Sequence, residues 1–249
     1  MNQPINKFPS KDEIKNAYHL LRSEAPASNN FQNIKHQRVL PFATYCPWLD
    51  DISFLEIYSK AQSHTLVDIY RCYELWDLVK QALNIEGNIL EVGVWRGGGT
   101  GSILASAVKD SNKRIFLADT FSGVVKAGPN DTNYKGGEHS DASFELVDNY
   151  LSSLNLSNYK LLQGIFPEDT SAECEGNIAM LHCDVDVYSS ANDILSWTLP
   201  KLSSGGILVF DDYGFAGCEG VTNFCNELKL DRQFTFLHNL NGHAIFIKR

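Results

Sequence analysis

Four aspartates are the residues of this chain whose types and spacing point most directly to chemistry. Asp184 and Asp186 lie in the string HCDVDVY, and Asp211 and Asp212 are adjacent in VFDDYG. Each pair follows a short apolar run, which is typical of a buried parallel strand, and ligands of α/β proteins bind at the carboxyl ends of such strands. Between the pairs, SANDILSWTLPKL and the turn SSGG predict a helix and a return to a second, parallel strand.

Neighbouring strands lie about 4.8 Å apart, so these carboxylates are predicted to converge on one small volume. Like charges at that spacing do not all stay ionised unless a positive charge joins them. A divalent cation would supply that charge, and all-oxygen ligation favours magnesium, calcium or manganese over zinc. The alternative is structural, because carboxylates at strand ends also serve as helix caps and loop residues.

The second informative segment is the glycine-rich string EVGVWRGGGT at residues 91–100. It joins an apolar run to a helical pattern, where a tight turn lets the backbone approach a ligand. Trp95 stands where the dinucleotide fingerprint needs its second glycine, and the chain has no P-loop GK[ST]. NAD and ATP are therefore disfavoured.

Two acids flank that turn. Glu91 precedes Gly93 by two residues, and Asp119 ends the next predicted strand, where an acid can accept both hydroxyls of a ribose. This order of acid, glycine and acid is the arrangement by which enzymes of this fold bind S-adenosylmethionine. The alternative is an ordinary tight corner between a strand and a helix.

The elements that must position these residues follow from apolar periodicity. Residues 1–64 are irregular and interrupted by prolines, and we expect an N-terminal extension with short helices that covers a substrate or a second subunit. From Thr65 onward, apolar residues recur at helical spacing through TLVDIYRCYELWDLVKQAL. Strands and helices then alternate, and two final strands flank an Asn-Gly turn. Residues 65–249 are therefore predicted to form an α/β, doubly wound, mostly parallel seven-stranded sheet with a C-terminal antiparallel hairpin.

Composition limits the partners of the chain. Its 249 residues carry a formal net charge of −9 with a pI of about 5.2, which disfavours nucleic acid and anionic membranes as partners. The absence of an apolar stretch of ~18 residues predicts a soluble, cytoplasmic protein. Six cysteines without paired CxxC spacing are expected to be buried free thiols.

The chain resembles the macrocin, mycinamicin and novobiocin type of sugar O-methyltransferase. The resemblance covers residues 65–249 and is carried by motifs in family order: EVGVWRGG, DTFSG at 119–123, a Ser143-x-Glu145-x-Val147 helix, DxDxY at 184–188 and DDYG at 211–214. It implies a Rossmann-like class I methyltransferase fold with S-adenosyl-L-methionine as methyl donor. It also implies Mg²⁺ or another hard divalent cation, a small-molecule acceptor that contains a sugar, and a homodimer.

The resemblance also implies roles for single residues. Asp184, Asp211 and Asp212 would bind the metal, and Asp184 or Asp186 would be the base that acts on the sugar hydroxyl. His139 is an alternative base, whereas His182 and His243 are predicted to be satisfied core residues. The predicted cofactor contacts are Thr65, Leu66, Glu91, Gly93, Val94, Trp95, Arg96, Gly97, Asp119, Thr120, Phe121, Ser122, Ser143, Gly164, Phe166 and Asp184. Trp95 is included for its place beside the glycine turn, and the alternative for this ring is a core position.

The chain departs from the family pattern at Val185, where a glycine is usual. Valine does not readily take a positive φ, and this bears on the direction in which Asp186 points. Two other functions compete with the methyltransferase. The DVD string resembles the DxD of metal-dependent glycosyltransferases that use nucleotide sugars, but such enzymes do not need Glu91, Gly93 and Asp119. A non-catalytic scaffold with this fold would be expected to have lost some of the four aspartates.

Overall fold

The structure is a computed structural model that describes residues 10–23, 46–96 and 99–249. The chain divides into two compact units, Met1–Pro47 and Trp48–Arg249. In the first unit the described element is α1 (Lys11–Ser23), which begins with a capping box. The Glu13 carboxylate accepts from the Ser10 backbone N–H at 2.7 Å, and the Ser10 hydroxyl accepts from the Glu13 backbone N–H at 3.3 Å.

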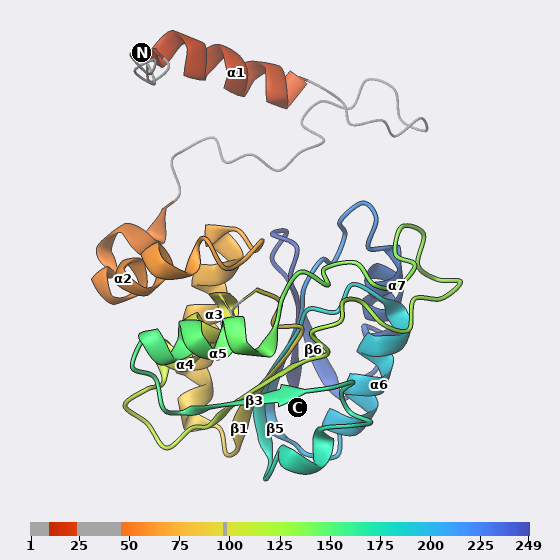
Figure 1. Cartoon of the computed structure of the whole chain (residues 1–249). Helices are drawn as coiled ribbons and strands as arrows, with labels where there is room; N and C mark the ends of the chain where they lie inside the picture. Colours follow the sequence, from red (N-terminus) through yellow and green to blue (C-terminus); the bar gives the residue numbers. More distant parts are fainter. Residues whose placement is uncertain (1–9, 24–45, 97–98) are drawn as a thin grey trace. The chain divides into compact units, whose positions relative to one another are not determined.

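The second unit is built on a seven-stranded sheet with the order β3-β2-β1-β4-β5-β7-β6 (Figure 1). Strands β1 to β5 pair in parallel, and β7 is antiparallel to both β5 and β6. This topology confirms the predicted fold class. The strands are β1 (Asn88–Val92), β2 (Ile115–Asp119), β3 (Tyr159–Gln163), β4 (Ile178–Cys183), β5 (Leu202–Phe210), β6 (Phe234–His238) and β7 (Ala244–Lys248).

Helices cover both faces of the sheet and bury two separate apolar clusters. On one face α3 (Ile69–Gln81), α4 (Gly99–Ala107) and α5 (Phe144–Ser153) pack over residues such as Ile89, Leu117 and Val209. On the other face α6 (Tyr188–Thr198) and α7 (Glu219–Leu228) pack over residues such as Leu90 and Phe210 (Figure 1). The short helices are η1 (Pro47–Asp50), η2 (Ala82–Asn84) and η3 (Ser171–Glu173).

Helix α2 (Ile52–Ala61) also belongs to this unit. Its fully buried Phe54 makes edge contacts with the ring of Tyr73 at 4.8 Å, and it packs against Trp76 at 5.9 Å between ring centroids. Residues 48–64, which the sequence analysis assigned to the N-terminal extension, therefore pack with α3 and α4.

Two local predictions need correction. Helix α3 begins at Ile69 rather than Thr65, because the Asp68 carboxylate accepts the backbone N–H groups of Tyr70 and Arg71 at 2.9 and 3.1 Å and caps the helix. The string SSGG is not a turn before the fifth strand but a bulged part of β5. Leu202 pairs with Ile178 and Ile207 with Met180, so six residues of β5 span three of β4.

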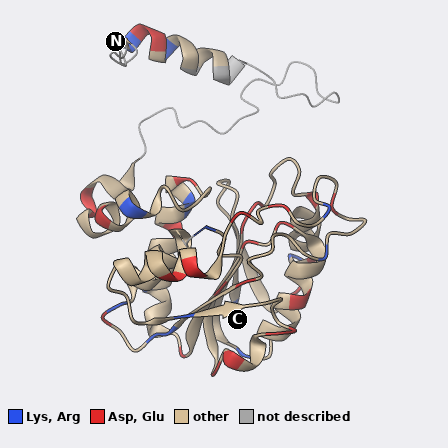
Figure 2. Ribbon diagram, in the orientation of Figure 1, with Lys and Arg blue, Asp and Glu red and all other residues tan. Residues whose placement is uncertain are grey.

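Charged residues of both signs occur along the helices and loops of this unit (Figure 2). All six cysteines are free thiols, and five of them are buried. Among the described residues, none of the helices has the length and apolar character needed to cross a bilayer.

Candidate active site

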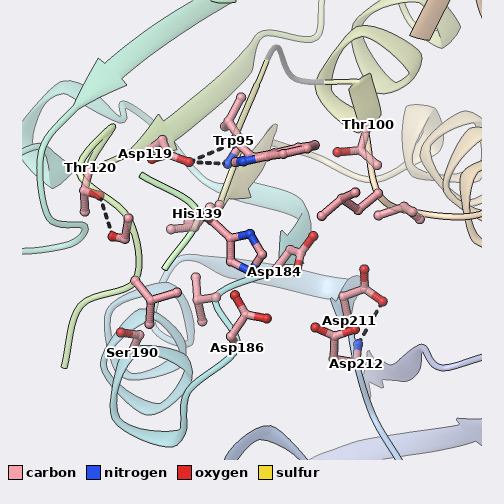
Figure 3. A pocket seen from close by; sticks show the side chains of 18 of the residues that line it. Trp95, Thr100, Asp119, Thr120, His139, Asp184, Asp186, Ser190, Asp211 and Asp212 are labelled. Carbon is pink, nitrogen blue, oxygen red and sulfur yellow. Dashed lines mark hydrogen bonds between the residues drawn. The ribbon is translucent and has the colours of Figure 1, made fainter. Parts of the chain in front are cut away.

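A cavity of about 380 Å³ opens at the carboxyl ends of β1, β2, β4 and β5. All four aspartates of the sequence motifs line it, and Figure 3 shows them grouped on one side, with Asp119 and Trp95 across from them. The structure therefore brings together most of the predicted site. The predicted residues on its wall are Thr65, Leu66, Gly93, Val94, Trp95, Asp119, Thr120, His139, Gly164, Phe166, Asp184, Asp186, Asp211 and Asp212.

Five predicted cofactor contacts lie away from this wall. Ser143 caps α5 by accepting the Leu146 backbone N–H at 3.2 Å, and Phe121 packs edge-on against Phe144. The guanidinium of Arg96 pairs with Asp141. Two more residues complete this group. Ser122 lies on the exposed loop after β2, and Glu91 is fully buried beneath the ends of the strands. Gly97 lies outside the described residues.

Backbone hydrogen bonds continue past the ends of the strands and fix the aspartates. The Asp184 N–H donates to the Val92 carbonyl at 2.9 Å, and the Asp211 N–H donates to the Cys183 carbonyl at 3.0 Å. Gly93 has φ 93°, and a Cβ atom there would lie 1.7 Å from the Asp184 carbonyl oxygen. The glycine is therefore required by the neighbouring strand end and not only by a ligand.

Asp119 organises the glycine turn. One carboxylate oxygen accepts the backbone N–H groups of Val94 and Trp95 at 2.7 and 2.8 Å, and the other accepts that of Phe121 at 2.7 Å. Trp95 and Phe121 both have φ 50°, so these bonds hold two residues in the left-handed region. Asp119 thus reaches the cavity and fixes part of its wall.

Asp186 is directed into the cavity by an unusual backbone. The Val187 N–H donates to the Val185 carbonyl at 2.7 Å, and Asp186 between them has φ 64°, which makes a γ-turn with a left-handed central residue. Asp186 itself adopts the positive φ, so the backbone of Val185 does not have to adopt one. The departure from the family glycine at 185 is therefore compatible with a cavity-facing Asp186, whose carboxylate accepts the Tyr134 hydroxyl at 2.7 Å.

The aspartates carry more negative charge than the cavity stabilises. Burial and the charges of Asp211 and Asp212 raise the pKa of Asp184 well above its usual range. Burial also raises the pKa of Asp186. Burial and the neighbouring Asp211 raise the pKa of Asp212 to about 7. An added cation would relieve this repulsion, and the oxygen donors suit a hard divalent ion.

Arg71 supplies one positive charge, and the sequence analysis missed it. Although burial of Asp211 opposes ionisation, His243 and Arg71 lower the pKa of its carboxyl. The Arg71 guanidinium pairs with Asp211, lies 3.5 Å from Asp212 and donates to Asp68 at 2.9 Å. Arg71 belongs to the buried face of α3 with Leu75, four residues later, and a charge at such a position was the available signal.

His182 and His243 were predicted to be satisfied core residues, and this is only half right. Both are fully buried, and each places Nδ1 against a carboxylate, that of Glu91 at 2.8 Å and that of Glu74 at 2.6 Å. The Nε2 atom of each imidazole, however, has no hydrogen-bond partner among the described residues.

The described part of the chain contains two groups of potential metal ligands. Within each group, the ligand atoms lie within 4.8 Å of one another. One is Asp186 with Asp212 and Cys218, and the other is His182 with Asp211 and His243. The predicted metal set is divided between them, with Asp212 in the first, Asp211 in the second and Asp184 in neither.

The loop over residues 122–143 forms the remaining wall. It contributes Tyr134 and His139, whose ring meets that of Trp95 edge-on with centroids 6.3 Å apart. The loop is tied to the glycine turn by Asp141, which accepts the Trp95 indole N–H at 2.8 Å and pairs with Arg96. These hydrogen bonds from Trp95 and Arg96 lower the pKa of Asp141.

Cation binding at these aspartates is expected to weaken below pH 7. Because the pKa of Asp212 is about 7, a proton occupies this carboxylate at lower pH and must leave when a cation binds. The apparent Kd for Mg²⁺ is expected to rise by about tenfold for each pH unit below 7. Calorimetric titration of Mg²⁺ between pH 5.5 and 8.5 measures this, and a Kd that does not change with pH would contradict it.

The same shift fixes the sign of the pH dependence of stability. The folded protein holds the Asp212 proton more tightly than the unfolded chain, whose carboxyl has the ordinary pKa of 3.8. This group therefore lowers the free energy of unfolding of the ion-free protein as pH rises from about 4 to 7. Added Mg²⁺ is expected to restore the melting temperature above pH 7.

Comparison with known proteins identifies the family. The model of the macrocin O-methyltransferase (TylF) family matches residues 59–249. The chain belongs to this family. The match covers the cavity from Thr65 onward, including all four aspartates.

Three relatives have names that describe their reactions. One is an 8-demethyl-8-(2,3-dimethoxy-alpha-L-rhamnosyl)-tetracenomycin-C 4'-O-methyltransferase of Streptomyces olivaceus. It is 30% identical to this chain, over 65% of this chain and 67% of its own length. A demethyldecarbamoylnovobiocin O-methyltransferase of Streptomyces niveus is 31% identical, over 61% of this chain and 63% of its own. A mycinamicin III 3''-O-methyltransferase of Micromonospora griseorubida is 31% identical, over 63% of this chain and 67% of its own.

Solved structures agree with the fold. The O-methyltransferase NovP matches with a TM-score of 0.64 and 25% identity, over 74% of this chain and 82% of its own. The calicheamicin methyltransferase CalS11 matches with a TM-score of 0.61 and 18% identity, over 83% of this chain and 95% of its own. The Rossmann-like methyltransferase fold of this family member is thereby established.

Proposed function

We propose that this member of the family transfers a methyl group from S-adenosyl-L-methionine to a hydroxyl of a sugar, with the help of a divalent cation such as Mg²⁺. The observation that carries the proposal is the convergence of Asp184, Asp186, Asp211 and Asp212 on one cavity beside the glycine turn. The sugar-containing natural products in the relatives' names support this acceptor class, and a nucleotide sugar or a polysaccharide unit has the same hydroxyl chemistry. Family membership sets the glycosyltransferase alternative aside.

The wall around the glycine turn suits the cofactor. Gly93, Val94 and Thr65 line one part of the cavity, and Asp119 presents a carboxylate at the end of β2. Asp119 Oδ2 already accepts two backbone N–H groups, but Oδ1 accepts only one, so Oδ1 keeps a lone pair that can accept a ribose hydroxyl. The cofactor supplies an already activated methyl group, and the protein has to hold it in line with the acceptor oxygen.

The opposite wall suits a hard cation and an acceptor hydroxyl. Asp184, Asp211 and Asp212 would hold the ion, and a ligand atom of Asp186 lies within 4.8 Å of one of Asp212. The ion supplies Lewis acidity toward the sugar hydroxyl, whose own pKa is far above 7. This assignment keeps the predicted set and leaves Asp186 beside the ion.

Asp186 is the proposed proton acceptor. Its carboxylate lies on the cavity wall, and burial raises its pKa above the ordinary value of 3.8, which makes it a stronger proton acceptor. The Tyr134 hydroxyl donates to one carboxylate oxygen and leaves the other for the substrate. Asp184 and His139 are the alternative bases on the same wall, and His139 lies on an exposed part of the loop.

Calorimetric titration of S-adenosylhomocysteine in Mg²⁺ and in EDTA tests the proposal directly. Binding in both buffers, followed by methyl transfer to one member of a panel of glycosylated natural products and nucleotide sugars, is the expected result. A protein that binds no S-adenosylhomocysteine in either buffer would contradict the methyltransferase assignment. Sedimentation velocity of the same samples tests the predicted homodimer.

Replacing Asp119 by Ala is expected to weaken S-adenosylhomocysteine binding by about 30- to 150-fold, or about 2–3 kcal/mol, which is the usual contribution of a charge-assisted hydrogen-bond pair. Titration calorimetry measures the affinity. Asp119 also holds the backbone of Val94, Trp95 and Phe121, so Asp119→Asn is the matched variant: its amide oxygen can still accept the Val94 and Trp95 N–H groups, although its NH₂ group cannot accept that of Phe121. An affinity unchanged in Asp119→Ala would remove this residue from the cofactor site.

A further inference from the structure

A buried polar layer lies behind the cavity, between the sheet and α3. It combines Glu91 on β1, His182 on β4, Asp211 after β5 and His243 before β7. Glu91 pairs with His182 in the parallel register, and the pairing of Phe210 with Ala244 places His243 opposite Asp211. Helix α3 adds Glu74 and Arg71, three residues apart on one helix face. Glu91, His182 and His243 are fully buried, and Asp211 is 2% exposed.

The carboxylates of this layer fix the proton on Nδ1 of both imidazoles. A carboxylate facing Nδ1, as Glu91 faces His182 and Glu74 faces His243, requires that nitrogen to carry the proton. In a neutral imidazole the Nε2 atom then presents a lone pair. Both Nε2 atoms are buried without a hydrogen-bond partner in the described part of the chain, although buried polar atoms are nearly always satisfied. Carboxylate, histidine and a free Nε2 are the parts of a metal-binding unit with its supporting acid.

The third potential ligand lies at a suitable distance. Ligand atoms of His182, His243 and Asp211 all lie within 4.8 Å of one another, and His243 Nε2 is 3.6 Å from Asp211 Oδ1. Tetrahedral ligands at zinc bond lengths are separated by about 3.4 Å, so small side-chain shifts suffice to enclose an ion. Two imidazoles and one carboxylate suit Zn²⁺ and similar transition metals and disfavour Mg²⁺.

We propose that His182, His243 and Asp211 form a second, buried cation site of the Zn²⁺ class, with Glu91 and Glu74 as the acids that orient the two imidazoles. The site is separate from the cation of the proposed reaction, because neither histidine lines the cavity. Asp211 is the residue that the two regions share. A buried ion would hold this carboxylate in place beside Asp212.

The charge of the layer fits this occupant. Glu74, Glu91 and Asp211 bring three negative charges, and Arg71, which also pairs with Asp68 and lies 3.5 Å from Asp212, offsets only part of them. A bound dication would offset the remaining negative charge. Two protons, one on each Nε2, would give the same total and are the alternative occupant that the experiment must separate from a metal.

The test uses the full chain without a histidine tag, purified without chelator. We expect its metal content to show one transition-metal ion per chain in the presence of excess Mg²⁺. After chelation, Co²⁺ is expected to restore one equivalent with the visible absorption of a tetrahedral site and with release of protons. His182→Gln and His243→Gln are each expected to abolish that absorption, and Glu74→Gln to weaken Co²⁺ binding by about 10- to 100-fold.

His238→Gln, which changes an exposed histidine on β6, is the matched control and should keep the Co²⁺ spectrum. Wild-type protein that neither contains nor takes up a transition metal, and whose imidazole ¹⁵N signals show protonated Nε2 atoms, would overturn the proposal. The result stands on the wild-type protein even if a variant does not fold. S-Adenosylhomocysteine binding by the same samples reports on the proposed function separately.

Discussion

Replacing Asp186 by Asn is expected to lower the turnover of methyl transfer by about 10²–10⁴-fold, the usual contribution of a well-placed general base. Asparagine keeps the size of the side chain and can still accept the Tyr134 hydroxyl, but its amide does not take a proton from a sugar hydroxyl. Asparagine also tolerates the φ of 64° at this position. The loss is therefore expected in kcat, with affinity for S-adenosylhomocysteine nearly unchanged.

Two companion variants make this result decisive. His139→Gln removes the alternative base and is expected to cost much less turnover, because His139 lies on an exposed part of the loop. Tyr134→Phe keeps Asp186 but removes its orienting donor, and it is expected to shift the acid limb of the kcat profile as well as to lower kcat. If His139→Gln is the more damaging change and Asp186→Asn keeps its rate, His139 is the base.

The second large effect is expected from Asp212→Asn. This variant should lower Mg²⁺ affinity by more than about 100-fold, because even the loss of a residue that only orients a metal ligand costs about 10- to 100-fold. Turnover of methyl transfer should fall together with the Mg²⁺ affinity. At the same time the ion-free variant should melt at a higher temperature than the wild type at pH 8. The reason is that Asp212, with a pKa of about 7, is ionised there against its buried neighbours.

Titration calorimetry with Mg²⁺, thermal melting and single-turnover methyl transfer measure these three effects. Asp148→Asn, a change in a carboxylate of α5 that does not line the cavity, is the control for the loss of one negative charge. An Asp212→Asn enzyme that stays fully active in chelator would show that the reaction needs no cation at this position.

Local sequence patterns predicted most of the fold and the positions of the four aspartates. The two strands before the aspartates are short apolar runs, and the four aspartates follow β4 and β5 within one to three positions, so this information is contained in short stretches. The start of α3 was misplaced because Asp68, within the apolar repeat, acts as a cap. The string SSGG was taken as a turn because glycine and serine favour turns, whereas pairing with β4 draws it into a bulged strand.

The buried layer could not be predicted in this way. Arg71 meets Asp211 across 140 residues of sequence, and Glu74 meets His243 across 169. No local pattern encodes such pairs, because they arise only when α3 packs on the sheet. Glu91 shows the same limit: its position in the motif suggests a contact with the cofactor, but its carboxylate faces His182.

The backbone bonds that join the strand ends bear on how this enzyme can evolve. Backbone hydrogen bonds link Val92 to Asp184 and Cys183 to Asp211 across three strands, so the start of the glycine turn and the aspartates form one rigid block. The loop over residues 122–143 is attached to that block mainly through side chains such as Asp141. Mutations and insertions in the loop can therefore reshape this wall of the cavity while the block that carries the aspartates is inherited unchanged.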